Sequence, residues 1–153
     1  MIVYRIAKTR HIYDLTGAGA RIYGGRWNHK GIGMIYTSEN RSLASLEFLV
    51  HAPHAILPTD LSIAAIRVPD SIISKEISIS DLPDNWNKYP SPLKLADIGT
   101  RWALSNETLL LRVPSVVIPH EFNILINPSH TDINKIAISK IEKYQFDDRL
   151  LST

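Results

Sequence analysis

Cysteine is absent from this chain of 153 residues, which excludes disulfide scaffolds, thiolate zinc sites and cysteine nucleophiles. No apolar run approaches the ~20 residues of a membrane-spanning helix. Arg5 interrupts the N-terminal stretch, which therefore lacks the apolar core of a signal peptide. The sequence also has no internal repeat, low-complexity tract or linker. We therefore expect a single domain over residues 1–153 in a soluble, cytoplasmic protein without a membrane partner.

Several signature motifs are missing as well. The run Gly17-Ala18-Gly19 would need a third glycine at position 22 to form a dinucleotide-binding fingerprint, and that position is Ile22. Neither a phosphate loop ending in Gly-Lys-Ser/Thr nor a Gly-x-Ser-x-Gly elbow occurs. His51 and His54 stand three apart with Pro53 between them, and no His-Glu-x-x-His motif follows. We expect capping or surface roles for these histidines and no metal site.

The residues that are present predict an α+β fold with many short strands and two or three helices. Apolar residues make up 44% of the chain and charged residues 21%, which is enough apolar material for a core. One helix is expected over roughly 40–51, between a cap in Ser38-Glu39-Asn40 and Pro53, and another from Ser91-Pro92 to about Asn106. Strands are expected at residues 2–6, 34–37, 61–68, 72–79, 109–113, 116–118, 124–126 and 136–146.

Glycine is concentrated near the start, because residues 16–33 hold six of the seven glycines. Such density indicates tight turns or a close backbone approach to a ligand. Within this segment Arg26 follows Gly24 and Gly25, where backbone bulk is minimal. A guanidinium group at such a position suits the oxygens of a phosphate. The structural alternative is a turn arginine that pairs with a local carboxylate.

The charge is unevenly distributed although the net charge is only +2. Residues 1–52 carry seven Lys/Arg and three Asp/Glu, whereas residues 53–153 carry ten and twelve. This bias suggests a phosphate-bearing partner, either a nucleotide or a nucleic acid, with chance variation as the alternative. Because no run of Lys/Arg occurs, a nucleic acid bound along an extended groove is the less favoured of these two partners.

The helix expected over 40–51 carries a carboxylate in its apolar face. Leu43, Leu46 and Val50 define that face, and Glu47 falls inside it. A buried carboxylate needs a partner, because burying it unpaired costs roughly several kcal/mol of folding free energy. Two interpretations are open: a structural Glu at the edge of the face or in an ion pair, and a catalytic carboxylate at the floor of a cleft.

Two further residues are candidates with ordinary alternatives. Tyr36 lies in a strand just before this helix, where it either joins the core or presents its ring to a flat ligand. Ser115 follows Pro114 and precedes the run expected to form a strand at 116–118. Most serines in such a place have no special role.

Taken in order, these segments resemble the RES-domain toxin family, which is named for an Arg, a Glu and a Ser. The three would be Arg26, Glu47 and Ser115 here. The resemblance runs nearly end to end, and only residues 53–90 match loosely. It is carried by Gly17-Ala18-Gly19-Ala20-Arg21, Gly24-Gly25-Arg26-Trp27-Asn28, Tyr36-Thr37-Ser38-Glu39, Ser42–Glu47, Val50-His51, Leu111–Ser115, Pro119–Asn123, Asn127–His130 and Phe146–Leu150.

The resemblance implies a fold and an activity. RES domains are similar to ADP-ribosyltransferases of the diphtheria-toxin type, with short, mostly antiparallel strands. They are toxins of type II toxin–antitoxin pairs, and they break down NAD at the nicotinamide–ribose bond by hydrolysis or phosphorolysis. Some members transfer ADP-ribose to a protein, which is the alternative activity. The implied partner is an Xre-type helix-turn-helix antitoxin that covers the active site, with no direct binding of nucleic acid.

The same resemblance suggests a role for each candidate. Glu47 would stabilise the ribosyl cation, or would hold the ribose hydroxyls and orient the attacking water. Arg26 would bind the pyrophosphate, with Arg5 as a second phosphate ligand. Tyr36 would stack on the nicotinamide or ribose, and Ser115 would donate to a phosphate, the ribose or Glu47. NAD is then a substrate, and neither a cofactor nor a metal is needed. The alternatives from another class are a nucleic-acid-binding module and a catalytically silent interaction protein in which Arg26 and Glu47 form a structural ion pair.

Overall fold

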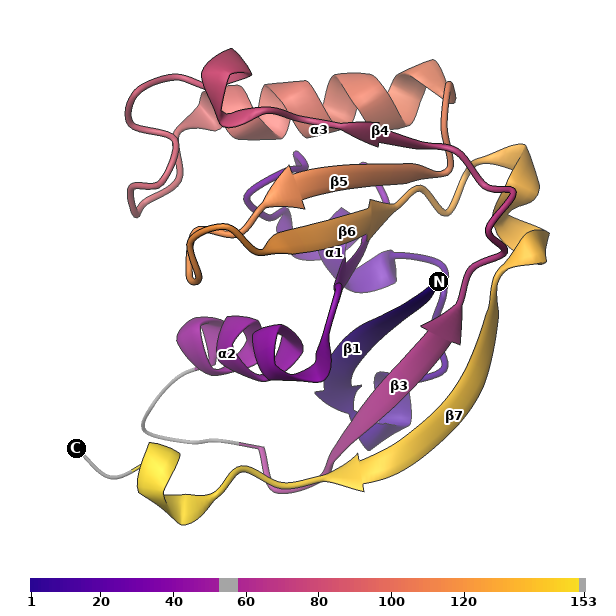
Figure 1. Ribbon diagram of the computed structural model, residues 1–153, viewed down its shortest axis with the longest axis vertical. Helices are drawn as coiled ribbons and strands as arrows, with labels where there is room; N and C mark the ends of the chain where they lie inside the picture. The colour runs from indigo at the N-terminus through magenta and orange to yellow at the C-terminus, as the bar shows by residue number, and fades with distance from the viewer. Residues whose placement is uncertain (53–57, 152–153) are drawn as a thin grey trace.

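A computed structural model describes residues 1–52 and 58–151, so that Pro53 and His54 of the sequence analysis lie outside the described residues. The described residues confirm the expected α+β fold, with seven strands in one sheet and three α-helices (Figure 1). The strands are β1 (Ile2–Lys8), β2 (Ile35–Ser38), β3 (Leu61–Arg67), β4 (Ser74–Glu76), β5 (Leu110–Pro114), β6 (Phe122–Ile126) and β7 (Ala137–Tyr144). The helices are α1 (Ala18–Tyr23), α2 (Arg41–His51) and α3 (Leu93–Ser105), with short 3-10 turns at Thr9–His11, Ile79–Asp81, Thr131–Lys135 and Asp148–Leu150. None of the described helices has the length and apolar content needed to cross a membrane.

The sheet has the strand order β4-β5-β6-β2-β1-β3-β7, and among the described strands only the β4–β5 pair is parallel. β1 pairs with β3 over seven residues and β2 pairs with β6 over four, whereas β1 and β2 are in register only at Tyr4 and Ser38. The sheet therefore opens between β1 and β2. Figure 1 shows the consequence, with β4, β5 and β6 in one part of the molecule and β1, β3 and β7 in the other.

The strands β5 and β6 pack against hydrophobic clusters on both faces, which explains why most of their residues are apolar. Leu110 and Ile126 face one hydrophobic cluster, while Leu111 and Leu125 face a second cluster that includes Leu95 and Trp102 of α3. Helix α3 lies across this part of the sheet in Figure 1. A third cluster joins Ala44 and Phe48 of α2 to Ile6, Ile63 and Phe146, and it fixes α2 beside β1.

Helix α2 begins as the sequence predicts, because the Asn40 side chain accepts a hydrogen bond of 2.7 Å from the Leu43 N–H. Its buried face differs from the prediction. Leu43 and Ala44 are buried, but Val50 is 56% exposed. The face turned to the core is therefore shifted toward Ala44 and Phe48, and Val50 lies outside it.

Two predicted strands are corrected by the structure. Residues 116–118 form no strand, because the chain turns after Ser115 and the backbone N–H groups of Val117 and Ile118 donate to the Ser115 hydroxyl. The strand expected over 72–79 is reduced to Ser74–Glu76. A three-residue strand suffices there, because β4 is an edge strand that pairs only with β5.

Gly99 of α3 provides a test of how this helix holds the glycine-rich segment. A Cβ at Gly99 would lie 1.8 Å from the Trp27 carbonyl oxygen, so we expect Gly99→Ala to destabilise the protein by about 1–3 kcal/mol or more. Gly19→Ala in α1 is the matched control, since nothing lies within 4 Å of its added Cβ. Urea unfolding of both variants measures the effect, and equal stability of the two would contradict the packing described.

Candidate active site

A cavity of about 680 Å³ lies where the sheet opens. Its walls come from β1, β2 and α2, from α1 and the glycine-rich turn that follows it, and from the loop after β5. Glu47, Arg26, Tyr36 and Arg5 all line it, so the fold brings four of the five predicted site residues to one cavity. Ser115, the fifth, contacts Glu47 directly.

The Glu47 carboxylate is held through one of its two oxygens. Its Oε1 accepts hydrogen bonds from Ser115 Oγ at 2.8 Å and from Asn123 Nδ2 at 2.7 Å. Its side chain keeps 19% of its exposure. Its Oε2 lies 4.0 Å from His51 Nδ1. One oxygen is thus fixed by the protein, and the other is available to the cavity.

Ser115 can only donate toward Glu47. Its Oγ accepts from the N–H groups of Val117 at 3.0 Å and Ile118 at 3.1 Å, so both lone pairs are used. Its single hydrogen then goes to Glu47 Oε1. Of the roles considered for Ser115, hydrogen bonding to Glu47 is the one that this geometry provides.

Asn123 is a site residue that the sequence analysis did not single out. It lies on β6, lines the cavity and accepts a 2.7 Å hydrogen bond from Ser38 Oγ through its Oδ1. An asparagine between Phe122 and Ile124 is unusual, because asparagine is depleted in strands. That signal, together with its place in the stretch Pro119–Asn123 that carries the resemblance, could have identified it.

Tyr36 is fixed by its hydroxyl group, which donates to Asn28 Oδ1 at 2.7 Å and accepts from the Trp27 N–H at 3.1 Å. Gly25 allows this approach, since a Cβ there would lie 2.7 Å from the Tyr36 hydroxyl oxygen. Burial raises the pKa of Tyr36, more than the Trp27 hydrogen bond and the Arg26 charge lower it. The hydroxyl therefore stays protonated at neutral pH, and the ring forms part of the cavity wall.

Arg26 lies in the tight turn between Gly25 and Asn28, whose backbone groups bond each other. It does not pair with Glu47, so the structural ion pair considered from the sequence does not form. Its Nη1 donates instead to the carbonyl oxygens of Trp86 at 3.0 Å and Lys88 at 3.3 Å. Burial lowers the pKa of Arg26, and the charge of Glu47 opposes that shift. Arg26 thus anchors residues 86–88, and its charge also interacts with that of Glu47.

Arg5 lies on β1 and donates through its two Nη groups to the carbonyl oxygens of Asp14 and His11. Burial lowers the pKa of Arg5, and Asp14 partly compensates. Arg5 lines the cavity, and its two hydrogen bonds also hold the segment after β1. Of the seven basic residues in positions 1–52, Arg5 and Arg26 are the two that reach this cavity.

His51 of α2 also lines the cavity. Its Nδ1 lies 2.6 Å from the Glu47 backbone carbonyl oxygen, which can only accept, so Nδ1 carries a hydrogen. Within residues 1–52 and 58–151, no group of three His, Asp or Glu side chains is arranged to hold a metal ion.

The mouth of the cavity is apolar and exposed. Tyr23 is 78% exposed, Tyr89 is 88% exposed, and Val50 lies at the same opening. Tyr89 follows the segment that Arg26 anchors, which places an aromatic ring from residues 53–90 at the site. Exposed apolar groups around the opening of a cavity are typical of a surface that binds a ligand or a partner.

These features define a small α+β domain with a cavity built around a carboxylate and two arginines. A family model described as the RES domain matches residues 2–147. The chain therefore belongs to the RES-domain toxin family. It is 41% identical over 147 residues to the "Prs ADP-ribosylating toxin" of Sphingobium sp. (strain YBL2), covering 95% of this chain and 91% of that protein.

Two further comparisons are in line with this family assignment. The chain is 40% identical to a "Toxin Res" of Yersinia enterocolitica over 98% of this chain and 99% of the relative. The fold matches a chain in the crystal structure of the M. tuberculosis MbcT–MbcA toxin–antitoxin complex with a TM-score of 0.72. That match covers 98% of this chain and 86% of the other at 17% identity, so it establishes the fold.

Ser115→Ala tests the turn that supports Glu47. The variant removes the acceptor of the Val117 and Ile118 N–H groups and one donor to Glu47. We expect a loss of about 1–3 kcal/mol in the free energy of unfolding, with faster hydrogen exchange at the amides of residues 117 and 118. Ser139→Ala, which removes a hydroxyl that donates to the Ala65 carbonyl far from the cavity, is the control. Exchange at residues 117 and 118 that matches wild type would contradict this geometry.

Proposed function

We propose that this toxin cleaves NAD at the nicotinamide–ribose bond and passes the ADP-ribosyl group to water or to phosphate. The observation that carries the proposal is the Glu47 carboxylate, with Oε1 bound by Ser115 and Asn123 and Oε2 left to a cavity that also holds Arg26. The family resemblance and the name of the Sphingobium relative support NAD as the substrate.

The chemistry needs a fixed negative charge more than an acid. When the C–N bond breaks, its electron pair leaves with nicotinamide, which departs as a neutral molecule. The ribosyl carbon becomes positively charged, and a carboxylate oxygen beside it lowers the energy of that state. Water or phosphate then forms the new C–O bond, and water gives up a proton as it does so. Glu47 Oε2 would stabilise the ribosyl cation or orient the attacking oxygen. It would already be in position when the substrate binds.

The arginines would bind the anionic part of NAD. Arg26 uses Nη1 for the carbonyls of Trp86 and Lys88, and its remaining N–H groups have no acceptor in the described part of the chain. A guanidinium with donors in one plane suits a pyrophosphate. Arg5 would provide the second positive charge from β1. The Tyr36 ring, held by its hydroxyl group, would form the flat wall for the nicotinamide or the ribose.

A protein is the second acceptor that we consider, and the name of one relative supports it. The relative named as an ADP-ribosylating toxin is 41% identical over nearly the whole chain, which favours transfer of ADP-ribose to a protein as the alternative activity. Both activities share the cleavage step and differ only in the group that attacks. An Xre-type antitoxin is the proposed partner, and the exposed rim of Tyr23, Val50 and Tyr89 is where it would cover the cavity.

The proposal is tested by incubating the purified protein with NAD, with and without phosphate, and identifying the products. Free nicotinamide with ADP-ribose indicates hydrolysis, and a phosphorylated ADP-ribose that appears only with phosphate indicates phosphorolysis. Isotope from adenine-labelled NAD that stays on protein indicates transfer. Unchanged NAD both with and without phosphate, and no label on protein, would overturn the proposal.

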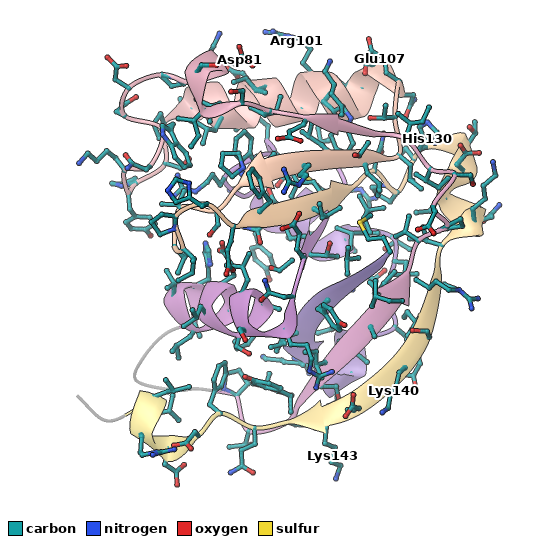
Figure 2. The ribbon with its side chains drawn as sticks, viewed as in Figure 1. Asp81, Arg101, Glu107, His130, Lys140 and Lys143 are labelled. Atoms are coloured by element: carbon teal, nitrogen blue, oxygen red, sulfur yellow. The ribbon has the colours of Figure 1, made fainter. Side chains whose placement is uncertain are left out.

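Glu47→Gln should separate charge from hydrogen bonding. The glutamine oxygen can accept the same bonds from Ser115 and Asn123, so we expect the melting temperature to hold or rise. NAD turnover should fall by roughly 10²–10³-fold, the scale for one preorganised electrostatic group, while KM changes little. Glu107→Gln, at an exposed residue just after α3 (Figure 2) that does not line the cavity, is the control. A stable Glu47→Gln variant with near-normal turnover would remove Glu47 from the mechanism.

Arg26→Lys should weaken NAD binding although the charge is kept. A lysine ammonium cannot hold residues 86–88 and present a planar pair of donors at the same time. We expect KM for NAD to rise by about tenfold, the equivalent of one lost charge-assisted hydrogen bond. Arg101→Lys, at the outer surface of α3 (Figure 2), is the matched control. Equal steady-state constants for Arg26→Lys and wild type would show that Arg26 acts only as a diffuse charge.

A further inference from the structure

We propose that Ser38 and Asn123 form a positioning relay that fixes Glu47 Oε1, so that Oε2 is the oxygen that faces the reacting sugar. This inference rests on the proposed function, because it assigns roles within the same site. It adds two positioning residues to Glu47 and Ser115, and it gives the two carboxylate oxygens different tasks.

The orientation of the relay follows from its hydrogen bonds. A carboxylate has no hydrogen to give, so the group of Asn123 that faces Glu47 Oε1 at 2.7 Å is the NH₂ group. The amide oxygen then faces Ser38 Oγ, also at 2.7 Å, and the Ser38 hydroxyl donates to it. Ser38 thereby fixes which end of the amide points to Glu47.

The relay is built on paired strands. Ser38 and Asn123 are direct partners in the register of β2 and β6. Ser38 is also the β2 residue that pairs with Tyr4 at the one point where β1 and β2 are in register. Both Ser38 and Asn123 line the cavity. The relay thus joins Glu47 on α2 to the rigid edge of the opening in the sheet, and a site on strands is held more closely than one on loops.

The bonding of Asn123 differs from that of the buried asparagines that serve the fold. Asn28 Nδ2 donates to the backbone carbonyls of Ala20, His29 and Ile32, and Asn127 Nδ2 donates to the carbonyl of Ala103. Both amides also bond a side chain, but their backbone bonds close turns and hold segments together. Within the described residues, the Asn123 side chain bonds only the side chains of Ser38 and Glu47 and no backbone group. Its contacts therefore set the position of one carboxylate.

The relay matters for the reaction because Oε1 receives two donors from different elements, Ser115 after β5 and Asn123 on β6. These donors fix the rotation of the carboxylate before substrate arrives. Oε2 then meets the developing ribosyl charge without the reorganisation that a free carboxylate would need. If Asn123 is lost, Glu47 keeps its charge but can rotate about the remaining bond to Ser115.

A double-mutant cycle tests the relay. We expect Asn123→Ala to lower kcat for NAD cleavage by about 10- to 100-fold through misplacement of Glu47, with KM near wild type. Ser38→Ala should lower kcat less, because Asn123 still reaches Glu47. Adding Ser38→Ala to Asn123→Ala should cause no further loss, since Ser38 acts only through Asn123. Asn134→Ala, an exposed asparagine outside the cavity, is the control and should leave kcat unchanged.

Each result decides the proposal. Unchanged kcat in Asn123→Ala, independent losses from the two substitutions, or a rise in KM alone would overturn it, the last by making Asn123 a substrate contact. If Asn123→Ala does not fold, Ser38→Ala and Asn123→Ser replace it in the test. Each should lower kcat while KM stays near wild type. A wild type without NAD turnover would overturn the proposed function only. The relay is then judged by growth arrest on expression in bacteria, which should weaken from wild type to Ser38→Ala to Asn123→Ala, and any other order would overturn it.

Discussion

The hydrogen bonds to Glu47 Oε1 are the constraint on which the site depends. A carboxylate in a largely apolar cavity is costly unless donors meet it. Here the donors come from the turn after β5 and from β6, while the carboxylate comes from α2. Helix α2 must therefore pack beside β1, and β5 and β6 must keep their register, before the site exists. The opening between β1 and β2 provides the space that the three elements enclose.

Arg26 shows how the glycine-rich segment serves both fold and site. Trp27 is buried against α3, where Gly99 allows close contact, and the neighbouring Arg26 holds residues 86–88. The same turn supplies the Trp27 N–H and the Asn28 oxygen that orient Tyr36. The sequence suggested a phosphate ligand or an ion pair at Arg26, and the structure adds a third role, the anchoring of a loop.

Local patterns in the sequence were sufficient for much of the fold and for part of the site. The Asn40 cap and the carboxylate on the inner side of α2 are readable within one helix, and the apolar runs of β5 and β6 identify buried strands. The relay was not readable, because Asn123 and Glu47 are 76 positions apart and only the sheet register joins them. The turn at Ser115 was missed because branched residues at 116–118 favour a strand, whereas two N–H bonds to one hydroxyl favour a turn. Ser115 itself was found through the family resemblance.

The most direct measurement is a crystal structure of the Glu47→Gln variant with NAD bound. We predict that the side-chain oxygen of residue 47 accepts from Ser115 and Asn123 while its amide nitrogen faces the bond between nicotinamide and ribose. Arg26 should contact the pyrophosphate, and the Tyr36 ring should lie against the nicotinamide or the ribose. NAD bound with its ribose away from residue 47, or with its pyrophosphate out of reach of Arg26, would contradict this assignment of the site.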